Sequence, residues 1–182
     1  MTYKLKLFIV SIIFLLSGCY PGISGKVVDG ITGNPIEGAV VLAQWTTTGG
    51  MIGLTHHNLY KIEETETDNE GGFSISGVYN PFVDPPEMVI YKKGYVPWRN
   101  DMDFMNSKWT HYKKNIWQDD MTYKLEYWKE GYSKEGLSLF VNVMGSDSNR
   151  TPKFSEIKSE ISTEAQKEID DKKKMKKSRG DK

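Results

Sequence analysis

The sequence predicts a mainly β fold: an antiparallel β-sandwich followed by a short extension that contains helix. Two observations lead to this prediction. Short apolar or alternating segments recur between Ile23 and about Tyr95. Clusters of Gly, Pro, Asn and Asp separate them, and these residues supply the backbone conformations that turns need. Short strands at this spacing are typical of a sandwich.

The first predicted strand alternates Ile23, Gly25 and Val27 with Ser24, Lys26 and Val28, the period of a half-buried strand. Residues 29–35 are dense in turn formers. The run from Ala39 to Trp45 is apolar except for Gln44, which predicts a strand buried on both faces. We interpret residues 46–58 as a polar loop.

Residues 60–67 alternate again, and residues 68–72 have the composition of a hairpin turn. Further strands are predicted around Phe73 and Ile75 and at residues 88–91. Three prolines make residues 79–86 a loop or a crossing between the sheets.

Residues 96–150 form an aromatic-rich extension with no sustained period before residue 122. Thr122–Lys129 is expected to be a short helix. Residues 137–144 fit a helix face and a strand equally well. Five aromatic side chains mark this extension: Trp98, Phe104, Trp109, Tyr112 and Trp117.

Residues 151–182 are predicted to be a charged helix with a disordered, Lys-rich tail. Apolar residues recur every three or four positions, which indicates an amphipathic helix; they are Phe154, Ile157, Ile161, Ala165 and Ile169. Six lysines and one arginine face a single aspartate in the last eleven residues. Such cationic blocks are usually disordered.

The N-terminus is organised as an export signal, with Lys4 and Lys6 ahead of an apolar run and small residues after it. Leu16-Ser17-Gly18-Cys19 resembles the lipobox of bacterial lipoproteins. This resemblance implies cleavage after residue 18, a diacylglyceryl group on Cys19 and a lipidated tether over residues 19–22. The protein would then be held to a membrane of the cell envelope. In a Gram-negative cell that would be the outer membrane, at its periplasmic face or at the cell surface.

Three motifs in order resemble the carboxypeptidase regulatory-like family. The first is an Ile-x-Gly-x-Val strand at Ile23, followed by Asp-x-x-Thr-Gly-x-Pro-Ile-x-Gly-Ala. The second is a Thr-Asp-x-x-Gly-x-Phe turn that begins at Thr67. The third is a strand that ends in Gly94-Tyr95. The resemblance covers residues 23–95 and implies a transthyretin-like, or prealbumin-like, sandwich. In that family the domain is an accessory module, and nothing here resembles the peptidase zinc motif.

The sequence indicates no enzyme, metal site or cofactor. His56 and His57 are adjacent, so on a strand they point to opposite faces, and a catalytic zinc needs three converging protein ligands. No Gly-x-Ser-x-Gly elbow or phosphate-binding loop is present. Cys19 is the single cysteine, so no disulfide is possible. An exported lipoprotein does not routinely meet nucleic acid.

We therefore expect a non-enzymatic, lipid-anchored binding or structural module of the bacterial envelope, whose partner is an envelope protein or a glycan. The alternative is a carbohydrate- or peptidoglycan-binding module that uses exposed Trp98, Trp109, Tyr112 and Trp117. Against this alternative, the same aromatics could cover one sheet as a second core. The Lys-rich tail could bind an anionic membrane or be simply solvated.

Overall fold

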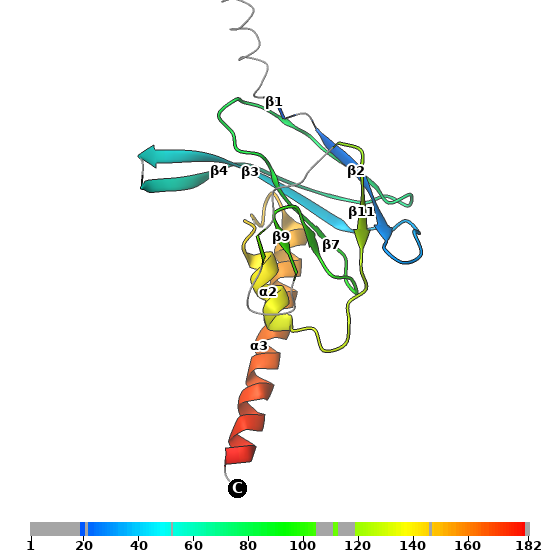
Figure 1. Ribbon diagram of the computed structural model, residues 1–182, viewed down its shortest axis with the longest axis vertical. Helices are drawn as coiled ribbons and strands as arrows, with labels where there is room; N and C mark the ends of the chain where they lie inside the picture. Colours follow the sequence, from blue (N-terminus) through cyan, green and yellow to red (C-terminus); the bar gives the residue numbers. More distant parts are fainter. Residues whose placement is uncertain are drawn as a thin grey trace, which may run out of the picture.

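In a computed structural model, the protein consists of a three-stranded sheet, a four-stranded sheet and a pair of helices (Figure 1). The structure describes residues 19–20, 22–51, 53–104, 111–112, 119–145 and 147–180. The predicted signal segment, residues 1–18, lies outside the described residues. The predicted mainly β sandwich with a helix-containing extension is confirmed.

The three-stranded sheet has the order β11–β2–β5. Its central strand, β2 (Ile23–Asp29), pairs antiparallel with β5 (Gly72–Ile75) and parallel with β11 (Met121–Leu125). The helix predicted at Thr122–Lys129 is therefore wrong. Tyr123 and Leu125 are both 1% exposed while Thr122 and Lys124 are exposed, which is the period of a strand.

The four-stranded sheet has the order β4–β3–β7–β8 and is antiparallel throughout. It consists of β4 (Leu54–Glu66), β3 (Val40–Met51), β7 (Glu87–Tyr91) and β8 (Trp98–Arg99). Residues 40–45 of β3 are all buried, which confirms a strand covered on both faces. Because β8 and β11 follow Tyr95, the two sheets take strands from the predicted extension.

The first core lies between the two sheets. Its larger members are Ile23, Val27, Val41, Trp45, Phe73, Ile75, Met88, Ile90, Tyr123 and Leu125. Gly25 permits the close approach of β2 and β11, since a Cβ atom there would stand 2.5 Å from the Met121 carbonyl oxygen. The predicted turns close this core, with Gly33 and Gly38 at positive φ and Asp68 accepting the backbone N–H groups of Glu70 and Gly72.

The second core lies between the other face of the four-stranded sheet and the helices α2 (Lys134–Asn142) and α3 (Pro152–Gly180). It contains Val40, Leu42, Ile62, Val89, Leu137, Phe140, Val141, Phe154 and Ile161. Residues 134–142 are helical, and this resolves the ambiguity left by the sequence. Leu139 and Val143, which a strand would have buried beside Leu137, are instead exposed.

Carboxylates from distant elements cap both helices. Glu64 of β4 accepts the backbone N–H groups of Lys153 and Phe154 at 3.0 and 2.9 Å. Glu168 of α3 accepts that of Lys134, at the start of α2, at 2.6 Å. A negative charge at a helix N-terminus satisfies unpaired donors and complements the helix dipole. Glu64, in the acidic run of β4, thus fastens the start of α3 to the sheet.

The predicted disordered tail is wrong for the residues up to Gly180, because α3 continues through them. Lys172 forms an ion pair with Glu168 one turn earlier, and Lys173 approaches Asp170. Such pairs support an exposed helix. This end of α3 projects away from the sheets, and the C-terminus lies at the opposite end of the molecule from the short strand β1 (Cys19–Tyr20) (Figure 1).

The loop predicted at residues 46–58 is also wrong. β3 and β4 stay paired from Thr46↔Leu59 to Met51↔Leu54, after a register shift at Trp45/Thr46. We call residues 46–60 the arm, a two-stranded ribbon that extends sideways beyond the sandwich (Figure 1). Its threonines favour extended backbone. Met51 and Leu54, at its end, are each 80% exposed.

Two further strand pairs complete the described structure. β1 pairs antiparallel with β6 (Val78–Tyr79), and β9 (Met102–Asp103) pairs antiparallel with β10 (His111–Tyr112). Cys19 and Tyr20, expected to belong to a tether, are therefore already joined to the folded domain. Among the described helices, none combines the length and the apolar character needed to cross a membrane.

Candidate functional site

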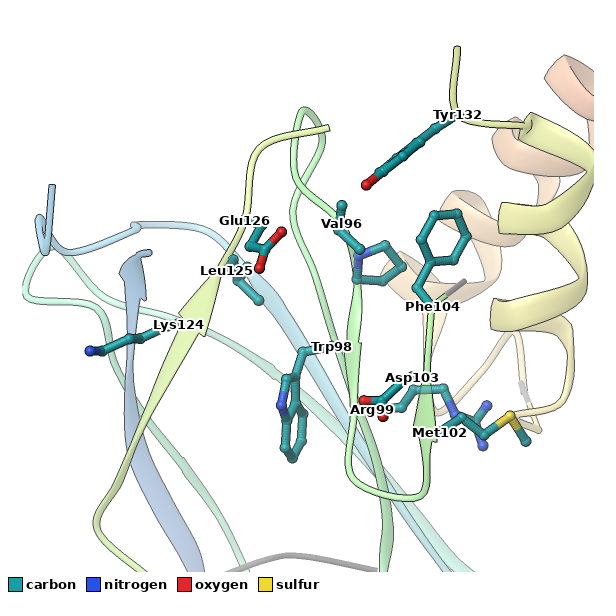
Figure 2. A pocket seen from close by; sticks show the side chains of 11 residues that line it. Val96, Trp98, Arg99, Met102, Asp103, Phe104, Lys124, Leu125, Glu126 and Tyr132 are labelled. Atoms are coloured by element: carbon teal, nitrogen blue, oxygen red, sulfur yellow. The ribbon is translucent and has the colours of Figure 1, made fainter. Parts of the chain in front are cut away.

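A pocket of about 200 Å³ opens where β8, β9 and the end of β11 meet the segment before α2 (Figure 2). Its lining comes from residues 96–104, residues 124–126 and Tyr132. These three segments are distant in the sequence. They meet because β11 returns beside β2 while β8 lies at the edge of the other sheet, next to the helices.

Aromatic side chains form the walls of this pocket. Trp98 is half-buried against the first core, with its ring 4.7 Å from that of Tyr123 in an edge-to-face arrangement. Phe104 packs on the second core and contacts the rings of Trp128, Tyr132 and Phe140 at 5.5 Å each. Figure 2 shows the Tyr132 hydroxyl directed toward the cavity. The aromatic positions are thus fixed by packing before any ligand enters.

Charged groups stand at the rim and behind the wall. Glu126 lines the rim and lies 3.7 Å from Lys129, while the Lys124 side chain points away from the other lining residues (Figure 2). Arg99, which also belongs to the lining, is fully buried and donates two hydrogen bonds to Asp101, behind the wall, at 2.9 and 2.8 Å. Burial raises the pKa of Tyr123 to about 12, so this supporting ring stays neutral.

The predicted binding aromatics are only partly described. Trp98 lines the pocket, and the backbone of Tyr112 pairs with Met102, which also lines it. Trp109 and Trp117 lie outside the described residues. Sequence reasoning did not select Tyr132 and Glu126 as site residues, because no local pattern connects them with Trp98. Phe104, which was not among the predicted binding aromatics, packs on the second core and also lines the pocket.

A second cavity of about 240 Å³ lies between the sheet and the helices, lined by Tyr91, Trp128 and Leu137 among others. Its charged groups neutralise one another, since Lys93 pairs with Glu160 and Lys134 pairs with Glu164. Burial, reinforced by the nearby carboxylates, raises the pKa of Tyr91 to about 12. This cavity is braced by its ion pairs, so the pocket at Trp98 is the better candidate for a ligand.

The two adjacent histidines lie on the exposed arm. His57 Nδ1 is 3.1 Å from the Thr48 hydroxyl and 3.8 Å from Asp84. Within the described part of the chain, no three His, Cys, Asp or Glu side chains gather in a way that could hold a metal ion.

The chemistry available at the Trp98 pocket is recognition. A cavity of about 150 Å³ can hold one benzene ring, so a space of about 200 Å³ suits a single ring. Aromatic walls supply apolar contact at little entropic cost, and the Tyr132 hydroxyl and the Glu126 carboxylate can exchange hydrogen bonds with hydroxyl groups.

Comparison with known proteins identifies no relative. No protein-family model matches the chain, and no curated protein matches it. Among solved structures, a streptococcal ancillary pilin is similar at 16% identity and a TM-score of 0.33, over 60% of this chain and 30% of the pilin. The 3-chlorocatechol 1,2-dioxygenase of Rhodococcus opacus 1CP is similar at 17% identity and a TM-score of 0.33, over 60% of each chain. Neither likeness is strong enough to carry an argument about this protein.

Proposed function

We propose that the protein is a non-enzymatic, lipid-anchored binding or structural module of the bacterial cell envelope. The observation that carries the proposal is the position of Cys19. The sequence predicts this residue to be the lipidated N-terminus of the mature chain, and β1 begins at the same residue. β1 lies at one end of the molecule, opposite the projecting end of α3 (Figure 1). A lipid at Cys19 would therefore hold the domain by one end. The pocket, the arm and α3 belong to the folded body beyond that anchor.

Metabolic labelling with a fatty-acid analogue tests the anchor. The wild-type protein should incorporate the label, and Cys19→Ser should remain an unlabelled, uncut precursor because only the thiol accepts the diacylglyceryl group. The matched control is Tyr20→Asp, which keeps the acceptor and should stay labelled. In a Gram-negative cell this control should also lose outer-membrane sorting, by resemblance to enteric lipoproteins. Label on the Cys19→Ser protein would contradict the proposal.

The pocket at Trp98 favours one specific binding role, recognition of a carbohydrate. A sugar presents an apolar ring face to an aromatic side chain and hydroxyl groups at its edge, and the pocket offers a partner for each. Its size suits one sugar unit, such as the end of a glycan or a single residue of a chain. The lipid-anchored module would then be a glycan-binding protein of the envelope.

Glycan-array binding by the mature chain tests this role. Trp98→Ala should abolish binding, and Tyr132→Phe should weaken it by removing one hydroxyl group. Trp128→Ala is the matched control, because Trp128 belongs to the same aromatic cluster but does not line this pocket. Urea denaturation of each variant shows whether it is folded. Equal loss of binding in the folded Trp98→Ala and Trp128→Ala variants would contradict a carbohydrate site in this pocket.

A further inference from the structure

Two exposed aromatic side chains lie close to Cys19. In the β1–β6 pair, Cys19 is directly opposite Tyr79, and Tyr79 and Phe82 are each 82% exposed. Opposite residues of an antiparallel pair have Cα atoms about 4.5–5.5 Å apart. Phe82 is three residues after Tyr79, and three residues of chain span at most about 10 Å. Tyr79 and Phe82 are therefore neighbours of the residue that would carry the lipid.

The loop that carries Phe82 has a fixed shape. The Phe82 backbone N–H donates to the side-chain oxygen of Asn80 at 3.0 Å, and Val83, 5% exposed, holds the next position in the first core. Asp84 fastens the loop to the base of the arm, since its N–H donates to the Thr46 carbonyl at 2.8 Å and its carboxylate accepts from the Thr48 hydroxyl at 2.8 Å. The two aromatics are thus held outward by ordered backbone.

The segment that carries these aromatics has no charged side chain of its own, and the ionised groups beside it, Lys61 and Glu63, pair with each other and contact Ser76. Residues 46–60 and residues 76–83 contain no Asp, Glu, Lys or Arg, although 26% of the whole chain is charged. The lysines of the last turns of α3 lie at the opposite end of the molecule (Figure 1). Because the aromatics project from a segment without ionised side chains, they can approach lipid without the cost of stripping water from charges of their own.

We propose that residues 76–83 form a membrane-contact surface, in which Tyr79 and Phe82 enter the interface of the bilayer that holds the lipid of Cys19. The inference rests on the lipid attachment proposed above. A diacylglyceryl group joined to Cys19 places that residue at the headgroup level, and Tyr79, opposite it, must then lie at the same depth. Tyrosine favours this depth because its ring is apolar and its hydroxyl is hydrated. The contact fixes the orientation of the domain, with α3 directed away from the membrane.

The experiment attaches one saturated fourteen-carbon chain, like a myristoyl group, to Cys19 of the mature protein through a maleimide and measures its partition into phosphatidylcholine vesicles. One such chain gives only marginal, reversible binding, with a constant of about 10⁴ M⁻¹, so an added contact is measurable. The Tyr79→Ser/Phe82→Ser variant should partition about tenfold more weakly, as expected for withholding large apolar side chains from lipid. Ile31→Ser is the matched control, because Ile31 is 79% exposed on the turn that follows β2, at the end of that strand distant from β1, and should not contact lipid.

Amide hydrogen exchange gives an independent measurement on the same samples. Vesicle binding should slow exchange in residues 76–83 and leave residues 30–34 unchanged. Equal partition of the double variant and Ile31→Ser would overturn the proposal. So would protection of residues 76–83 that grows with protein concentration without vesicles, because a second copy of the chain would then cover the surface. The attached chain is synthetic, so absence of lipidation in cells would refute the anchor but would leave this test of the surface unaffected.

Discussion

Removing the carboxylate of Asp101 should destabilise the fold more than removing any exposed charge. Asp101 holds the Arg99 guanidinium through two hydrogen bonds of 2.9 and 2.8 Å, and the Arg99 side chain is fully buried. A third bond, from Arg99 Nη1 to the Phe140 carbonyl at 3.2 Å, joins β8 to α2. Asp101→Ala would leave a buried positive charge without its counter-ion.

Breaking a buried ion pair by deleting one partner typically costs about 3–5 kcal/mol. The Asp101 side chain is 16% exposed, so water can partly replace the carboxylate, and we expect the lower end, about 3 kcal/mol. The Arg99→Met/Asp101→Ala variant removes the stranded charge as well. It should recover at least about 1 kcal/mol of the loss, because an unbranched apolar side chain of similar length fills the same space.

Urea denaturation followed by tryptophan fluorescence measures these differences, provided that the slope with denaturant stays constant among variants. Lys129→Ala is the control, since its pair with Glu126 joins side chains that are 63% and 72% exposed and should contribute less than about 1 kcal/mol. If Asp101→Ala costs no more than this control, Arg99 is solvated or paired elsewhere, and the reasoning fails. A double variant less stable than Asp101→Ala alone would refute the stranded-charge explanation.

Two further predictions concern the three-stranded sheet and its first turn. Gly25→Ala should lower the free energy of unfolding by about 2 kcal/mol in urea denaturation, because the new Cβ atom would stand 2.5 Å from the Met121 carbonyl oxygen and 2.7 Å from the Tyr123 ring. Lys26→Ala on the same strand is the control and should cost little. Equal costs would mean that β2 and β11 are not in close contact. The backbone N–H of Thr32 lowers the pKa of Asp29 well below its usual value, outweighing the burial that raises it. A carboxyl group whose pKa is lowered by folding stabilises the folded state at a pH above its ordinary pKa of 3.8, and this stabilisation is lost as the pH falls. The difference in urea midpoint between the wild type and Asp29→Asn should therefore be constant near neutral pH and shrink below about pH 4. A difference that does not change with pH would contradict this assignment.

The sequence predicted best where local pattern and burial agree. The run at Ala39–Trp45, in which only Gln44 is polar, predicted a strand covered on both faces, because a layer on each side is needed to bury successive apolar side chains. Residues 68–72 were predicted to be a turn from their composition, and Asp68 stabilises this turn through backbone N–H groups that need no distant partner. Phe154 and Ile161 mark the buried stripe of α3 for the same reason, since helical period alone reveals it.

The failures share a dependence on distant residues. β11 was predicted to be helical because its local sequence does not reveal its strand partner. That partner is β2, in which Gly25 lies opposite Met121, 96 positions later in the chain. The arm could not be predicted because residues 46–58 carry no alternation that separates a ribbon from a loop. Residues 172–177 were expected to be disordered from charge alone, whereas α3 continues from a segment that packing on the sheet has already made helical.

The candidate site shows the same limit. Trp98 was selected from its residue type, and it lines the pocket. Tyr132 and Glu126 were not selected, because β11 brings Glu126 to the pocket and the packing of α2 brings Tyr132. Both placements are tertiary, and a single sequence holds no local signal for either.

The parallel pairing of β2 with β11 also sets the order in which this chain can fold. A chain that is synthesised from its N-terminus presents residues 23–29 early, but the strand that completes their sheet follows about a hundred residues later. Until then β2 has only β5 as a sheet partner, and Tyr123 and Leu125 are missing from the first core. Contacts between residues so distant in the chain form slowly. The first sheet therefore closes only after Met121–Leu125 has been made, late in the synthesis of the chain.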